Sequence, residues 1–368
     1  MKIPFFTLDR QNIKIGPEIK KAISEVVDSG RYVNDKKTKE FEEKWAAFNN
    51  QKYCLLTSSG TTALELAIKS IKTEDCKNVI TTSNSFIATS SAICANNLEP
   101  WFLDTGNDCN LNLGLLEEVL KSYSPKAFIL NVDLYGNPIN YDILTKLSKN
   151  YKRYLILDLA QAHGSTWLNE LLATYGDISC MSFYVSKTLG TLGEAGCILT
   201  NNLEIYEKCK SLRNHGRGKD NYSHDYLSGN NRNTEINAAI LLVKLKYLSD
   251  WIFKRAEIRD RYIKNLNQSK NIKLLDKKNK GGWIPYVFPI FVQNRNKIKE
   301  KMNKLGVECA VHYPTPMPLL ECYKNRSYYP HHFPNCYKQC NKVLTLPTFP
   351  ELENDEIDFV SEKLLEIV

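Results

Sequence analysis

The sequence lacks a long apolar run. No stretch approaches the ~20 apolar residues that a membrane-spanning helix needs, and the N-terminal segment MKIPFFTLDRQNIK has no apolar centre long enough for a signal peptide. The 11 cysteines show no obvious pairing pattern, so we expect free thiols in a reducing compartment. These absences predict a soluble, cytoplasmic protein without a membrane partner.

Strong charge of one sign and a usual metal-binding spacing are also missing. The 49 basic and 41 acidic residues leave a formal net charge of +8, and the basic residues are scattered except for KKNK at 277–280. No recognition motif accompanies this charge, so we predict no nucleic-acid partner, while an anionic small molecule fits it. The segment HHFPNCYKQC at 331–340 has two histidines and two cysteines, but not at a usual zinc spacing, and no metal is predicted.

Helical and strand-like patterns alternate through the first two thirds of the chain, without an internal repeat. Helical spacing is present in PEIKKAISEVVDSG, which ends at a glycine, in KTKEFEEKWAAFN and in TTALELAIKSI. Short apolar runs predict buried strands in NVITT, EPWFLD, KAFILNVD, YLILDLA, SCMSFYV and GCILT. The alternation predicts an α/β domain with a mostly parallel sheet, in which ligands bind at the carboxyl ends of strands.

The order of the segments changes from about Trp251. We expect a long charged helix to about Leu266, then WIPYVFPIFV, a helix in KIKEKMNKLG, a proline-rich stretch and a last acidic helix. The sequence therefore predicts a large α/β domain over residues 1–250 and a smaller C-terminal α+β domain over 251–368. The first ~30 residues are expected to pack with the small domain.

Two segments place polar residues next to predicted elements: one leads into a helix, and the other follows a strand. In TSSGTTALELA, small residues from Ser58 to Thr62 lead into a helix, where they fit an anion cradle or an ordinary helix cap. In LILDLAQAHG, Asp158 ends an apolar run and Gln161 and His163 follow. A buried carboxylate needs a cation or a donor; a protonated pyridine nitrogen would serve, and a helix cap or an arginine partner is the alternative.

Two further segments carry a lysine and a donor-rich loop. In MSFYVSKTLGTLGEAGC, Ser182 and Lys187 end an apolar run, and a glycine-bearing loop follows. A desolvated lysine there suits Schiff-base chemistry, although most lysines are simply solvated. In SGNNRNTEINAAI, Asn230, Asn231 and Arg232 precede a helix. Together the four segments offer a phosphate site, a carboxylate for a ring nitrogen and a lysine for an aldehyde, which are the needs of pyridoxal phosphate.

The chain resembles, essentially from end to end, the DegT/DnrJ/EryC1/StrS family of sugar aminotransferases. The motifs that carry the resemblance are IPF, SSGTTALELA, SFIAT, YGNP, LDLAQAHG, SFYVSK, LGEAG, LRNHG, NNR followed by NAAI, and HYPTP. The resemblance implies a fold-type-I, aspartate-aminotransferase-like large domain with a mostly parallel mixed sheet, and pyridoxal 5'-phosphate as the cofactor.

The resemblance also implies residue roles. Lys187 would form the Schiff base and move protons, and Asp158 would keep the ring nitrogen protonated. Gly60, Thr61 and Ser182 would hold the phosphate. Phe86 would stack on the pyridine ring, and Gln161 would form a hydrogen bond with the phenolic oxygen. Asn230 would reach the phosphate of a neighbouring subunit, which implies a homodimer with shared active sites.

The residues expected near the substrate leave its identity open. They are Arg31, Tyr32, His163, Asn231, His312 and Tyr313. The family often has tryptophan where Arg31 stands and an aromatic residue or serine where Asn231 stands, and it often differs at Ser228, Asn237 and Ala195. None of these departures removes a cofactor contact.

The implied reaction is a transamination in deoxysugar biosynthesis. L-Glutamate would convert the cofactor to pyridoxamine phosphate, which would aminate a UDP- or dTDP-linked keto-6-deoxyhexose to a nucleotide-linked amino-dideoxy sugar. HYPTP is similar to members that act at carbon 3, whereas the commoner family reaction at carbon 4 is slightly preferred here. Two alternatives are a pyridoxamine-dependent sugar dehydratase, whose class has histidine in place of Lys187, and a non-catalytic regulator or binding protein on the same fold.

Overall fold

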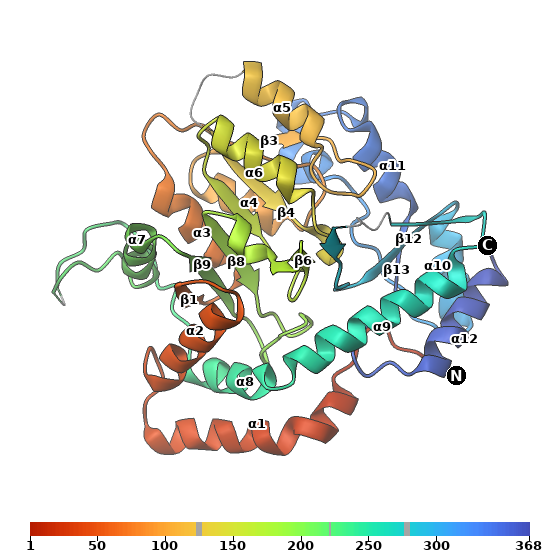
Figure 1. Ribbon diagram of the computed structural model, residues 1–368, viewed down its shortest axis with the longest axis horizontal. Coiled ribbons are helices and arrows are strands. Elements are labelled where there is room, and N and C mark those ends of the chain that lie inside the picture. The colour runs from red at the N-terminus through yellow and green to blue at the C-terminus, as the bar shows by residue number, and fades with distance from the viewer. Residues whose placement is uncertain (123–126, 221, 276–279) are drawn as a thin grey trace.

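The computed structural model describes residues 1–122, 127–220, 222–275 and 280–368 (Figure 1). At its centre is a seven-stranded sheet with the order β1-β9-β8-β5-β4-β2-β3. Its strands are β1 (Tyr53–Thr57), β2 (Asn78–Thr82), β3 (Glu99–Leu103), β4 (Ala127–Val132), β5 (Leu155–Asp158), β8 (Ile178–Ser182) and β9 (Gly196–Thr200). Strand β9 runs antiparallel to both of its neighbours, and the other paired strands run parallel.

Helices cover both faces of this sheet. One apolar core joins its strands to α1 (Asp9–Ser29), α2 (Lys36–Phe48), α5 (Leu113–Ser122), α6 (Tyr141–Asn150) and α8 (Glu235–Leu245). A second core, on the other face, joins them to α3 (Gly60–Ile71), α4 (Ala88–Ala95) and α7 (Leu203–Arg213). Because successive side chains of a strand point to opposite faces, Ile129 of β4 lies in the first core and Leu130 in the second. Strands buried on both faces have the continuous apolar sequences seen here.

The last third of the chain builds a further core around a three-stranded antiparallel sheet with the order β10-β12-β13. Its elements are α9 (Leu248–Leu266), β10 (Ile272–Leu274), β12 (Phe288–Val292), α10 (Arg295–Lys304), β13 (Val343–Leu346) and α12 (Asn354–Leu365). Ile3 from the N-terminus lies in the same core, where it forms a parallel bridge with Val307. Helix α11 (Pro334–Lys342) packs into a separate small core that includes Phe102 of β3.

Short elements complete the described part of the chain. The third sheet has the order β11-β6-β7, formed by β6 (Thr166–Trp167), β7 (Glu170–Leu171) and β11 (Gly281–Gly282). The 3-10 turns are η1 (Leu134–Gly136), η2 (Leu172–Tyr175), η3 (Met317–Leu319), η4 (Glu321–Arg326) and η5 (Pro330–His332). Across the described ranges, no helix combines the length and apolar character needed to cross a membrane.

The predicted α/β class with a mostly parallel mixed sheet is confirmed, and most predicted elements are present. Helix α1 ends at Gly30, whose φ of 66° is in the left-handed region that glycine favours. Strand β1 was not predicted, although YCLLT is a short apolar run. The predicted domain boundary falls within the first turn of α9, and the division into two domains stays a prediction. Residues 277–279 of KKNK lie outside the described residues.

Candidate active site

The predicted site residues follow strands whose carboxyl ends share one edge of the large sheet. Since β1, β2, β4, β5 and β8 run in one direction, the loops that follow them meet at that edge. These loops carry Gly60 after β1, Phe86 after β2, Asp158 and Gln161 at and after β5, and Lys187 after β8. The edge is where ligands bind in sheets of this kind.

The N-terminus of α3 packs tightly against the end of β8. A Cβ atom added to Gly60 would lie 2.8 Å from the Cβ of Ser182, and one added to Gly196 would lie 2.4 Å from the carbonyl carbon of Ser59. Ser59 is the N-cap, and its hydroxyl accepts a hydrogen bond from the Thr62 amide at 3.1 Å. The first amides of a helix have no partner within it, so those of Gly60 and Thr61 are placed, beside the Ser182 hydroxyl, to receive an anion.

Asp158 is a buried carboxylate that accepts hydrogen bonds from two neutral groups. Its side chain is 6% exposed, Oδ2 accepts a hydrogen bond from the Thr89 hydroxyl at 2.8 Å, and Oδ1 accepts one from the Ala160 amide at 3.2 Å. Burial raises the pKa of Asp158, against the effect of these donors and of the Lys187 charge. Neither a helix cap nor an ion pair with an arginine is present within the described residues, so the carboxylate is available to a ring nitrogen.

Lys187 presents its amine to an aromatic ring rather than to a carboxylate. Nζ lies 4.2 Å from the centre of the Tyr286 ring, and the Tyr286 hydroxyl is 2.8 Å from the hydroxyl of Ser186. The backbone amide of Lys187 donates to the Tyr184 carbonyl at 2.8 Å, which fixes the turn after β8. In the part of the chain that the structure describes, the Lys187 amine forms no ion pair, so it is free to react.

A hydrogen-bonded group lies beside these residues. The Gln161 amide donates to the Tyr313 hydroxyl at 3.1 Å, and its oxygen accepts from the Tyr135 backbone amide at 2.8 Å. The centres of the Phe86 and Tyr313 rings are 6.0 Å apart, and Phe86 is 55% exposed. An exposed aromatic ring at the mouth of a site is available to stack on a flat ligand.

The two predicted substrate histidines are in different surroundings. His312 Nδ1 is 2.9 Å from the Thr345 hydroxyl, and burial together with the Lys187 charge lowers the pKa of His312 to about 4. His163 is 1% exposed and packs between the rings of Trp45 and Phe183, where burial lowers its pKa to about 3. Contact of His163 with a substrate stays a prediction, and this burial weighs against it.

The other predicted substrate residues have partners elsewhere in the chain. Arg31 pairs with Asp35 at 3.3 Å, and the Tyr32 carbonyl accepts from the Glu235 amide at 2.9 Å. The Asn231 carbonyl accepts from the Ser58 amide at 3.1 Å, which places it beside the α3 cradle. None of these interactions reaches Lys187 or Asp158 of the same chain.

The exposed Asn230 belongs to a segment that projects from the molecule. Its side-chain oxygen accepts a hydrogen bond from Arg232 Nε at 2.9 Å. Asn230 lies in the connection between α7 and α8, and the described part of this connection before Asn230 extends away from the body of the protein in Figure 1. Tyr222 and Leu227 on this connection are each 93% exposed. Large apolar side chains on a projecting segment are typical of a protein–protein contact.

Sequence reasoning missed three residues that position the site. Thr89 and Tyr135 lie in the segments SFIAT and YGNP, which had been noticed as motifs without a role for these residues. Thr89 donates to Asp158, and the Tyr135 hydroxyl donates to the His312 carbonyl. Tyr286 lies far along the chain, and no pattern around it indicates that its ring would meet Lys187.

A lysine amine and a buried carboxylate beside a helix N-terminus match what pyridoxal phosphate requires, and together with the sheet they define a fold-type-I pyridoxal-phosphate enzyme. The sequence profile of the DegT/DnrJ/EryC1/StrS aminotransferase family matches residues 13–365, and the chain belongs to that family. Solved structures of relatives include one with the cofactor PMP bound. The predictions of the family, the cofactor and aminotransferase activity are thereby confirmed.

Individual relatives cover the chain almost completely. It is 30% identical to the erythromycin biosynthesis sensory transduction protein EryC1 of Saccharopolyspora erythraea, over 98% of each chain. It is 28% identical to dTDP-3-amino-3,4,6-trideoxy-alpha-D-glucose transaminase of Streptomyces venezuelae, over 98% of this chain and 96% of the relative. The crystal structure of S. venezuelae DesV with a ketimine intermediate superposes with a TM-score of 0.95, at 28% identity, over 99% of this chain and 98% of that one.

Proposed function

We propose that this protein transfers the amino group of L-glutamate to the keto carbon of a nucleotide-linked keto-6-deoxyhexose. The observation that carries this proposal is the Lys187 amine, which lies over the Tyr286 ring without an ion pair among the described residues, at the same sheet edge as the buried carboxylate of Asp158. The same pair disfavours both a dehydratase, whose class lacks the lysine, and a non-catalytic binding protein.

The identity of the sugar rests on the relatives. Two of them carry dTDP-3-amino sugars in their names, dTDP-3-amino-3,4,6-trideoxy-alpha-D-glucose transaminase and dTDP-3-amino-3,6-dideoxy-alpha-D-galactopyranose transaminase. These names, with the segment HYPTP around His312, favour carbon 3 over the carbon 4 that the commoner family reaction suggests. Two other relatives have UDP-linked sugars in their names, so both UDP and dTDP stay candidates for the nucleotide. Carbon 4 is the second candidate.

Each cofactor residue has a distinct task in this proposal. Bound pyridoxal phosphate supplies the aldehyde and the electron sink for the exchange of an amino group. The amides of Gly60 and Thr61 and the hydroxyl of Ser182 bind its phosphate, and the Asp158 carboxylate holds the proton on its ring nitrogen.

The remaining residues orient the cofactor and move protons. Phe86 covers the ring, and the Gln161 amide, held by Tyr135 and Tyr313, donates to the phenolic oxygen. Lys187 Nζ removes a proton from Cα of glutamate and, in the return half-reaction, delivers one to the sugar carbon that gains the amine.

The proposal is tested with a panel of substrates. We expect glutamate to aminate one member of a set of UDP- and dTDP-linked 3-keto and 4-keto sugars, with the product identified by NMR. Selectivity for a dTDP-linked 3-keto sugar supports carbon 3, and selectivity for a 4-keto sugar moves the proposal to the second candidate. If a purified protein that binds pyridoxal phosphate aminates none of them, the proposed substrate class is wrong.

We also propose a homodimer in which Asn230 completes the site of the other subunit. A closed two-fold pair is the commonest way to share a site. Lys187→Ala and Asn230→Asp are each expected to be nearly inactive, the second because an added carboxylate opposes the cofactor phosphate. In a mixed dimer one site receives both changes and the other neither, so random mixing should restore about a quarter of all sites.

Co-expression of the two variants with different affinity tags isolates the mixed dimers. Their activity per dimer should approach half that of the wild type. If isolated mixed dimers are as inactive as either parent, Asn230 acts within its own subunit or away from the site. Asn230→Ala is the matched control, because it removes the amide without adding charge and should lose less cofactor affinity than Asn230→Asp.

A further inference from the structure

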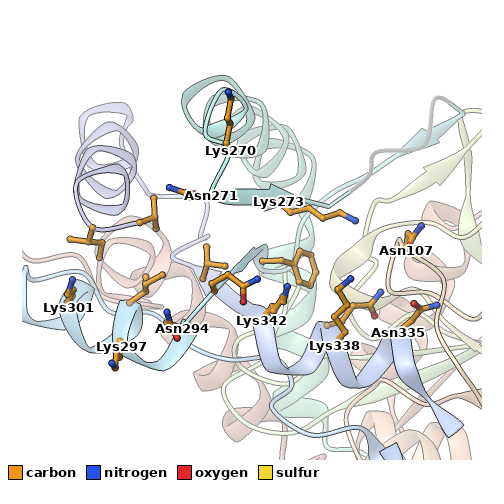
Figure 2. Close-up of a pocket in the computed structure, with 17 residues that line it drawn as sticks. Asn107, Lys270, Asn271, Lys273, Asn294, Lys297, Lys301, Asn335, Lys338 and Lys342 are labelled. Carbon is orange, nitrogen blue, oxygen red and sulfur yellow. The ribbon is translucent and has the colours of Figure 1, made fainter. Parts of the chain in front are cut away.

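A lysine-rich cavity lies over the sheet of the C-terminal core, outside the candidate active site. Its volume is about 600 Å³, within the range of small-molecule sites. The cavity is bounded by the edge strand β10 and the residues before it, the end of β12, α10 and α11 (Figure 2). Its lysines are Lys270, Lys273, Lys297, Lys301, Lys338 and Lys342.

These lysines outnumber the acidic groups around them. Apart from the terminal carboxylate of Val368, the described residues that line the cavity include no acidic group. Within the described part of the chain none of the six ammonium groups forms an ion pair or a hydrogen bond. The fold thus gathers six of the 49 basic residues, which are scattered along the sequence, around one cavity.

Hydrogen bonds fix the two helices that carry four of these lysines. The Arg295 guanidinium at the start of α10 donates to the Val343 carbonyl at 3.0 Å, which joins α10 to the end of α11. The amides of Asn335 and Cys336 at the start of α11 donate to the Asp104 carboxylate, each at 2.9 Å. The Asp104 carboxylate thus caps the N-terminus of α11 and does not neutralise the lysines. The helices cannot move apart to relieve the repulsion without breaking these contacts.

Repulsion among the lysines has a cost that an anion would remove. Lys297 and Lys301 are four residues apart on α10, and Lys338 and Lys342 four apart on α11. Like charges at this spacing destabilise a helix. The described residues that line the cavity include six lysines and no arginine. Lysine binds a phosphate group as a point charge, so the cavity suits phosphate.

The cavity also has neutral groups that suit a ligand larger than an ion. The side chains of Asn107, Asn271, Asn294 and Asn335 supply amide donors, and Phe291 and Ile298 supply apolar surface. The lysines come from α10, α11 and the β10 region, and so surround one hollow rather than following one line. A compact ligand fits this arrangement better than an extended polymer, which would need a charged track.

We propose that this cavity binds a small oligophosphate, such as a nucleoside triphosphate or an inorganic triphosphate. The site is separate from the one that holds Lys187. Helix α11 lies between the two sites. Its Lys338 lines the cavity. Its Cys340 is buried on the other side, with the sulfur 3.9 Å from Asn84 Oδ1 in the loop that leads to Phe86. None of the lining residues of the cavity has a role in the proposed transamination.

Titration calorimetry on the cofactor-loaded enzyme tests the proposal. We expect binding of ATP and of inorganic triphosphate, weaker binding of inorganic phosphate, and a loss of affinity as salt is raised. The double variant with Lys273→Gln and Lys338→Gln removes one charge from the strand edge and one from α11, and should bind about tenfold more weakly. Tighter binding of ATP than of triphosphate would show that the nucleoside contributes.

A matched control separates this cavity from general charge and from the active site. Lys20→Gln on α1 with Lys149→Gln on α6 removes the same charge from exposed positions outside the cavity, and should change the affinity less than twofold. Both double variants should keep transaminase activity, and neither should melt below the wild type, since Lys338→Gln relieves the repulsion with Lys342. Three outcomes overturn the proposal: no oligophosphate binding by the wild type, equal affinity in the two double variants, or binding of a short DNA duplex without binding of ATP or triphosphate.

Discussion

Lys187→Ala is expected to abolish transamination while leaving the protein folded. The residue is the proposed proton carrier, and the loss of a positioned acid or base alone typically slows a reaction about 10²–10⁴-fold. The fold should survive because, within the described residues, the amine forms no ion pair and its main contact is with the Tyr286 ring. Steady-state kcat with glutamate and the sugar substrate, together with the melting temperature, measures both effects.

Two controls separate chemistry from structure in this experiment. Lys187→Arg keeps the positive charge near Asp158 and Tyr286 but has no amine that releases a proton at neutral pH, so it should be as inactive as the alanine variant. A small primary amine added to Lys187→Ala should restore part of the activity, because it can occupy the space left by the side chain. Retention of more than about a tenth of wild-type kcat by either variant contradicts the assignment of Lys187.

The location of the site could be predicted from the sequence because parallel strands share an edge. Asp158, Lys187 and Phe86 are far apart in the sequence, but each follows an apolar run that forms a strand of one direction. Once the runs are recognised as parallel strands, the loops after them must converge. The glycine at position 60 is explained in the same way, since the approach of α3 to Ser182 leaves no space for a side chain.

Contacts that depend on tertiary packing could not be predicted. Tyr286 meets Lys187 only because the chain after α9 returns to the large sheet, and no local pattern encodes that path. Likewise, Lys273 and Lys338 belong to a strand and a helix whose proximity follows from the order β10-β12-β13 and the packing of α11 on β12. His163 was expected near the substrate, and its burial between the rings of Trp45 and Phe183 could not be predicted from the local sequence.

Asp158→Asn is expected to lower kcat by about 10²-fold or more while the protein still binds the cofactor. The proposed task of the carboxylate is to stabilise a positive charge on the ring nitrogen, and removal of one preorganised electrostatic partner from a buried site typically costs about 10²–10³-fold in rate. The amide that replaces it is of similar size and can still accept a hydrogen bond from Thr89 or Ala160. The visible spectrum of the bound cofactor should change along with the rate.

The effect of Asp158→Asn on the stability of the cofactor-free protein is a second, independent measurement. The variant is expected to lose activity but not stability. Burial raises the pKa of Asp158 above its ordinary value of 3.8, and a carboxyl whose pKa rises on folding destabilises the folded state at every pH above that ordinary value. The neutral asparagine removes this cost, so the melting temperature of the cofactor-free variant at pH 8 should equal or exceed that of the wild type.

Thr89→Val is the matched control, because it removes the hydroxyl that donates to Asp158 Oδ2 at 2.8 Å but leaves the charge. It should lower kcat far less than Asp158→Asn and lower the stability slightly, since a buried acceptor loses a donor. If Thr89→Val is as inactive as Asp158→Asn, the hydrogen bond and not the charge is what the reaction needs. If Asp158→Asn keeps wild-type turnover with glutamate, Asp158 is a structural residue and the ring nitrogen has no carboxylate partner here.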